Sequence, residues 1–146
     1  MNIPFLGTWR KKRDPARGVA VFSGGDIDKS SVAQLLSECE LLRSQAEEAG
    51  VELDDSAASL EALDQVVPRW RDDEETLPRL GNDAGLYLGT VIVRTVPGAA
   101  WEIRPNGRPV VRLSSGRELD VVADGLTWAS TGAPELSYVY AEAAEA

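Results

Sequence analysis

Five aspartates are the residues of this chain with the clearest potential for chemistry: Asp26, Asp28, Asp54, Asp55 and Asp64. Carboxylates can act as general acids or bases, and they can hold a hard cation. The chain has no histidine, which excludes Ser-His-Asp and Cys-His catalysis and histidine-ligated metal sites. Cys39 is the single cysteine and lies on the apolar stripe of a predicted helix, where we expect a buried structural thiol. We therefore predict no catalytic nucleophile, no cofactor and no transition metal.

The apolar stretch at residues 84–93 is the element around which those side chains would be positioned. Its apolar spacing of three to four suits a helix, although its β-branched cluster at 91–93 would also suit a buried strand. Glycines at 81, 85 and 89 would share one helical face. Each costs about 1 kcal/mol relative to alanine, which the close approach of another backbone would offset. We predict a core helix over residues 82–94, too short an apolar run to span a membrane.

The same face has a functional alternative, in which the glycines form a groove that admits a ligand or a partner segment. The residues that would line this groove are Gly85, Tyr87, Gly89 and Trp101.

Residues 1–17 form a basic and aromatic arm. Its candidate partner-binding residues are Phe5, Leu6, Trp9, Arg10, Lys11, Lys12 and Arg13. Apolar residues at spacings of three and four followed by basic ones are typical of a docking peptide for a membrane surface or an acidic groove. The alternatives are an arm that folds back over its own acidic body and a tail without fixed structure.

The net charge of −9 is unevenly distributed, because residues 1–18 carry a local excess of positive charge. An acidic body disfavours nucleic acid, whose binding depends on phosphate neutralisation, and it attracts basic partners. Acidity that serves only solubility is the alternative. We find no secretory signal, and one cysteine forms no internal disulfide, so we expect a cytoplasmic protein.

Capping residues and apolar periodicity predict two helices before the central stretch. The first spans residues 31–49, from a capping box at Ser31 to a terminating Gly50. The second spans residues 57–67, with Asp54, Asp55 or Ser56 as its cap, and Pro68 should break or kink it. A short strand is expected at residues 18–22.

After residue 98 the pattern changes to the alternation typical of strands. We predict a three-stranded antiparallel meander over residues 101–122, with turns at 105–107 and 114–117 and an exit turn at Asp124 and Gly125. A last helix should begin at Pro134 and turn Leu136 and Val139 inward. The prediction is a single α+β domain at residues 18–146, with helices in its first half, a central glycine-rich helix, the meander and a carboxy-terminal helix.

Two motifs carry a resemblance to known proteins. Residues 54–64 match the pattern Asp-x-Ser-x-x-Ser-Leu-x-x-Leu-Asp, and residues 85–92 read Gly-Leu-Tyr-Leu-Gly-Thr-Val-Ile, with Trp101 beyond. Over about residues 51–140 the chain resembles a group of uncharacterised bacterial domains, mostly actinobacterial. The resemblance implies one α+β domain and no catalytic residues. If Tyr87 is buried, its hydroxyl needs a partner, and Asp64 is a candidate.

The sequence is consistent with two classes of function. The first is a non-catalytic interaction protein that docks another protein through its acidic body or its arm. The second is a small-ligand binder or a carboxylate-dependent enzyme that uses aspartates near the central helix. A pocket where those aspartates converge with the central glycines would favour the second, and a filled core with an acidic surface would favour the first.

Overall fold

The glycine-rich stretch is helical, as its glycine spacing predicts, and it forms the longest element of the described chain. In the computed structural model, which describes residues 35–145, this helix is α4 (Leu77–Thr95). It begins five residues before the predicted start because Pro78 fits the first turn of a helix, where its missing N–H group is not needed. Ten of its side chains or glycines are buried, so α4 is the centre of the core.

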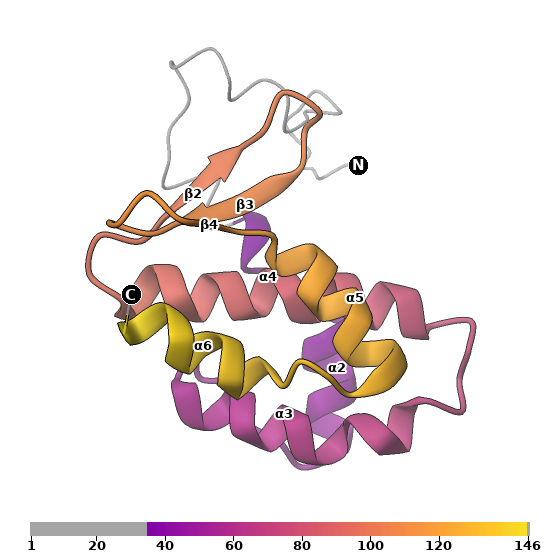
Figure 1. Ribbon diagram of the computed structural model, residues 1–146. Coiled ribbons are helices and arrows are strands. Elements are labelled where there is room, and N and C mark those ends of the chain that lie inside the picture. Colours follow the sequence, from indigo (N-terminus) through magenta and orange to yellow (C-terminus); the bar gives the residue numbers. More distant parts are fainter. Residues whose placement is uncertain (1–34, 146) are drawn as a thin grey trace.

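Four other described helices pack around α4 (Figure 1). They are α2 (Glu40–Glu48), α3 (Ala57–Trp70), α5 (Val121–Thr131) and α6 (Leu136–Glu145). In Figure 1 the sheet lies on one side of α4 and α3 lies on the other, with α6 between α3 and α4. No helix among residues 35–145 combines the length and the apolar character that crossing a membrane requires.

Helix α5 lies against the glycine face of α4, so that two backbones are in direct contact. A Cβ atom added at Gly85 would lie 2.7 Å from the Cα atom of Val122, closer than real Cβ atoms approach. A Cβ atom at Gly81 would lie 3.0 Å from the carbonyl oxygen of Gly125, a glycine of α5. The close approach of two helices therefore explains why glycines occupy this face of α4.

The meander forms as predicted, from strands β2 (Ala100–Ile103), β3 (Pro109–Arg112) and β4 (Glu118–Leu119) in the order β2-β3-β4. Both pairs are antiparallel, and the register places Trp101, Val111 and Leu119 in one row across the sheet. Val111 and Leu119 are buried, and the Trp101 ring covers Gly89 of α4. This apolar face joins the sheet to the core, and the protein is an α+β domain over its described residues.

The end of the meander differs from the prediction. Residues 121 and 122 do not continue a strand, and Asp124 and Gly125 do not form a turn, because all four lie in α5. Asp120 caps this helix: its Oδ1 atom accepts the N–H group of Ala123 at 3.2 Å. The valines suited a strand by propensity, but the cap and the contact of Gly125 with α4 decide for a helix.

The first predicted helix does not run unbroken to residue 49. Cys39 has a left-handed backbone, with φ of 42°, so α2 begins only at Glu40. A cap comes from another element, since the Oδ2 atom of Asp83 in α4 accepts the Leu42 N–H group at 3.1 Å. Gly50 ends α2 as predicted, with φ of 80° and a 2.8 Å hydrogen bond from the Val51 N–H to the Ala46 carbonyl oxygen.

Helix α3 extends beyond the predicted end. The helix continues through Pro68 and ends at Trp70, which was predicted to lie just after it. The predicted cap is correct, because the Ser56 hydroxyl accepts the Ser59 N–H group at 3.3 Å.

Candidate functional site

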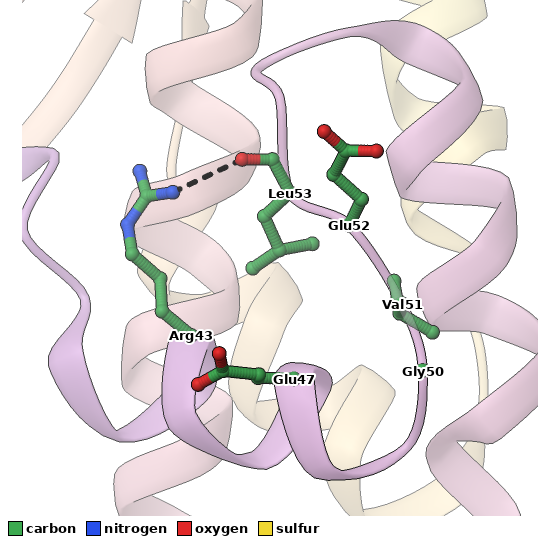
Figure 2. Close-up of a pocket in the computed structure, with 6 residues that line it drawn as sticks. All are labelled: Arg43, Glu47, Gly50, Val51, Glu52 and Leu53. Carbon is green, nitrogen blue, oxygen red and sulfur yellow. Dashed lines mark hydrogen bonds between the residues drawn. The ribbon is translucent and has the colours of Figure 1, made fainter.

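The loop between α2 and α3 borders a hollow of about 440 Å³ that is open to solvent (Figure 2). Six residues line it: Arg43, Glu47, Gly50, Val51, Glu52 and Leu53. Figure 2 shows α2 on one side of this hollow and the extended loop on the other. Gly50 creates the hollow, since its left-handed backbone turns the chain sharply out of α2. We call this feature the α2 hollow.

Arg43 fixes the loop of the α2 hollow. Its guanidinium donates to the carbonyl oxygen of Leu53 at 3.3 Å, the contact drawn in Figure 2. The same group donates to the carbonyl oxygens of Ser37 at 2.9 Å and Glu38 at 3.0 Å. One side chain therefore joins the start of the described chain, helix α2 and the loop before α3.

Asp55 neutralises Arg43 and connects it to the central helix. Its carboxylate lies 3.4 Å from Arg43 and 2.8 Å from Arg94 of α4, and 19 % of its side chain is exposed. The backbone N–H of Asp55 donates to the Tyr87 hydroxyl at 2.8 Å. Asp55 has φ of 64°, a conformation that aspartate tolerates better than most residues. This predicted acid–base candidate is thus bound on three sides by the protein's own groups.

Tyr87 is fully buried, and its hydroxyl has two partners. Besides the Asp55 N–H, it contacts the Ser59 hydroxyl at 2.7 Å, and Ser59 in turn donates to the Ser56 carbonyl oxygen. The prediction that Asp64 is the hydrogen-bond partner of the Tyr87 hydroxyl is wrong. Burial raises the pKa of Tyr87, so the phenol stays neutral at pH 7.

Asp64 instead caps α6 from its place on α3. Its carboxylate accepts the N–H groups of Leu136 at 2.9 Å and Ser137 at 3.2 Å, and also the Ser137 hydroxyl at 2.6 Å. The indole N–H of Trp128 donates to it at 2.8 Å, and Trp128 is fully buried. A carboxylate with four donors at a helix N-terminus has a complete structural role.

Three further acid–base candidates were predicted besides Asp55 and Asp64. Asp54 is exposed and accepts the hydroxyl and the N–H of Ser56, and the Ser56 hydroxyl is the main cause of its lowered pKa. Asp26 and Asp28 lie outside the described residues. Within residues 35–145, no group of three or more cysteine, aspartate or glutamate side chains is arranged to hold a metal ion.

The predicted ligand groove on α4 is occupied by the protein itself. Gly85 faces the backbone of α5, and Gly89 faces the ring of Trp101, whose Cζ2 atom would lie 2.8 Å from an added Cβ atom. Tyr87 is buried with its hydroxyl bonded to Ser59. A ligand at Gly89 would have to displace the Trp101 ring, and a ligand at Gly85 would have to displace α5.

A second open hollow, of about 390 Å³, lies where α2, α3 and α4 meet. Its lining includes Trp70 and Leu80 together with Asp72 and Asp73 of the acidic run at 72–75. Neither this hollow nor the α2 hollow includes Asp54, Asp55 or Asp64. The candidate partner-binding residues of the arm, 5–13, lie outside the described residues.

Sequence reasoning did not select Arg43, Glu47 or Glu52, the charged residues of the α2 hollow. The available signal was the helix end at Gly50 and Val51, which predicts an abrupt change of chain direction. It does not predict that the side chain of Arg43, about two turns before Gly50, would bind the returning loop.

Comparison with known protein families identifies the family of this chain. The model of a family described as a family of unknown function (DUF6278) matches residues 1–146, and so includes the arm that the sequence resemblance left out. Neither the curated proteins nor the solved structures contain a match to this chain. The match covers the full sequence given, and the chain belongs to the family of unknown function DUF6278.

Proposed function

We propose that this protein is a non-catalytic, cytoplasmic interaction module whose acidic surface binds a basic protein partner. One observation carries the proposal. Asp54, Asp55 and Asp64, the described aspartates considered for acid–base chemistry, line neither hollow, and the glycine face of α4 is covered by α5 and Trp101. Asp55 and Asp64 are each held by several groups of the fold, which is typical of structural carboxylates.

The distribution of charge supports a basic partner. Residues 35–145 contain 21 of the chain's 24 acidic residues but only nine of its 15 basic residues. Five of those nine arginines form ion pairs with carboxylates of the fold. The exposed acidic run at 72–75 forms no ion pair with an arginine of the described chain. Uncompensated negative charge of this kind accelerates and orients the encounter with a basic surface.

The test is affinity purification of the full-length protein from its native cell, with quantification of co-purifying proteins at low and high salt. We expect a protein partner that high salt releases, because the contact is between exposed charges. A variant with Asp72→Asn, Asp73→Asn, Glu74→Gln and Glu75→Gln should capture less of it. The matched control neutralises four exposed acids on other elements, Glu40, Glu61, Glu142 and Glu145. A stoichiometric small molecule without a protein partner would contradict the proposal and favour ligand binding.

A further inference from the structure

The α2 hollow combines an apolar floor with an acidic rim. Val51 and Leu53 supply partly buried apolar side chains, and Glu47 and Glu52 are exposed beside them (Figure 2). Neither glutamate forms an ion pair with an arginine of residues 35–145. The positive charge of Arg43 is offset by Asp55 at 3.4 Å. A segment that suits this hollow has one or two large apolar side chains next to lysines or arginines.

Such a segment is present in the same chain. Residues 5–9 include Phe5, Leu6 and Trp9, and four basic residues follow at 10–13. The volume of the hollow, about 440 Å³, is within the range of roughly 300–1,000 Å³ found for sites that enclose small ligands. It can therefore accept a large apolar side chain.

The start of the described chain is joined to the hollow through Arg43. Arg43, which lines the hollow, donates to the carbonyl oxygens of Ser37 and Glu38, so the first described residues lie against its wall. Residues 14–34 separate Arg13 from Leu35. An extended chain of that length reaches up to about 70 Å at roughly 3.3–3.6 Å per residue, so the linker is long enough for the arm to return to the domain. Covalent attachment also raises the effective concentration of the arm at the hollow.

We propose that residues 5–13 dock in the α2 hollow of the same chain. Trp9 or Leu6 covers Val51 and Leu53, and the basic residues pair with Glu47 and Glu52. The docked arm covers Glu47 and Glu52 and leaves the acidic run at 72–75 accessible to a basic partner. This inference does not require a basic partner protein. Its experiments probe other residues than the purification above, so either proposal can be refuted without the other.

Zero-length carbodiimide cross-linking of the full chain tests the contact directly. The reagent joins a lysine amine to a carboxylate, and the arm offers Lys11 and Lys12, with Lys29 as an internal comparison. We expect amide links from Lys11 or Lys12 to Glu47 or Glu52, which decrease as salt rises. Equal mixtures of ¹⁴N and ¹⁵N chains should give links within one chain only. Links between chains, links mainly to residues 72–75, or no links from Lys11 and Lys12 would each overturn the proposal.

Binding of a labelled peptide of residues 1–17 gives a quantitative second test. The receptor is the full chain with Arg10, Lys11, Lys12 and Arg13 replaced by glutamine, so that its own arm no longer competes. We expect the peptide to bind this chain about 10-fold more tightly than the wild type. Glu47→Gln with Glu52→Gln should weaken binding by about 3- to 10-fold, the loss of two exposed charge contacts. Glu61→Gln with Glu145→Gln is the control of equal charge, and an equal loss there would overturn the assignment.

Discussion

The contact between α3 and α6 and the loop between α2 and α3 use carboxylates in opposite ways. At the α3–α6 contact, Asp64 has four donors from two other parts of the chain, including the buried indole of Trp128. Along the α2 hollow, Glu47 and Glu52 are exposed and have no arginine partner among the described residues. A carboxylate with full partners stabilises the fold, and one without partners remains available for binding.

The same contrast distinguishes the two sequence motifs, at residues 54–64 and 85–92, from the residues of the proposed binding surface. Asp55, Ser56, Ser59 and Asp64 all have hydrogen-bond or ion-pair partners inside the fold. The glycines of the second motif are explained by α5 and by Trp101. The two motifs therefore describe how this fold is assembled, and the binding surface has to be sought among other residues.

The largest effect that we expect concerns the chemical reactivity of Cys39, which lies in the buried region beside Asp83. Desolvation by burial, with a further contribution from Asp83, raises the pKa of this thiol from 9.0 to about 12. At pH 8 the thiolate fraction should fall about 1,000-fold relative to the unfolded chain, since each pKa unit is a factor of ten. Alkylation rates with and without denaturant measure this ratio on the chain's only cysteine.

The same pKa shift has a consequence for stability. The unfolded chain loses the thiol proton near pH 9 while the folded chain keeps it to about pH 12, so stability should fall as pH rises across that window. A Cys39→Ala variant should lose this component of the pH dependence. Equal alkylation rates in the native and the unfolded protein would show that Cys39 is accessible and contradict the buried account.

Asp64→Ala should cause the next largest change. It removes the cap of α6 and leaves the buried Trp128 indole N–H without a partner, which together should lower the free energy of unfolding by about 2–4 kcal/mol. Asp54→Ala is the matched control in the same motif, because Asp54 is exposed, and it should cost under about 1 kcal/mol. Urea denaturation measures both, and equal costs would remove the distinction between the two regions.

Gly85→Ala should destabilise the protein by about 1–3 kcal/mol through overpacking, even though alanine favours a helix by about 1 kcal/mol. The added Cβ atom would meet the α5 backbone, which has no rotamer to change. Gly81→Ala, whose nearest contacts are at 3.0 Å, should cost less. Thermal unfolding ranks the two variants, and a Gly85→Ala protein as stable as the wild type would refute the close contact of α4 with α5.

Glu47→Gln with Glu52→Gln should have the smallest effect on the fold. Both side chains are exposed, so we expect a change in unfolding free energy within about 0.5 kcal/mol. Circular dichroism during urea denaturation measures it. A loss comparable to that of Asp64→Ala would mean that the rim of the α2 hollow is structural.

Periodicity, caps and turn residues were sufficient to predict the α+β class, the central helix and the meander. They did not predict α5, because Val121 and Val122 have high strand propensity and the decisive contacts, with Gly81 and Gly85, are distant in sequence. The left-handed Cys39 was missed for a similar reason, since the cap for α2 comes from Asp83. For the candidate site, the composition predicted an acidic surface. It did not predict that Asp64 has hydrogen-bond donors and Glu52 has no arginine partner among the described residues, because tertiary structure decides this.

Thermal unfolding of Asp55→Asn tests the central claim most directly, because Asp55 is an acid–base candidate that pairs with Arg43, a lining residue of the α2 hollow. If Asp55 is structural, losing its ion pairs with Arg43 and Arg94 should cost about 1 kcal/mol and lower Tm by a few degrees. Both arginines are partly exposed, so solvent screening keeps this cost small. A functional carboxylate is commonly a strained group whose replacement leaves stability unchanged or raises it. An unchanged or higher Tm for Asp55→Asn would therefore contradict the account.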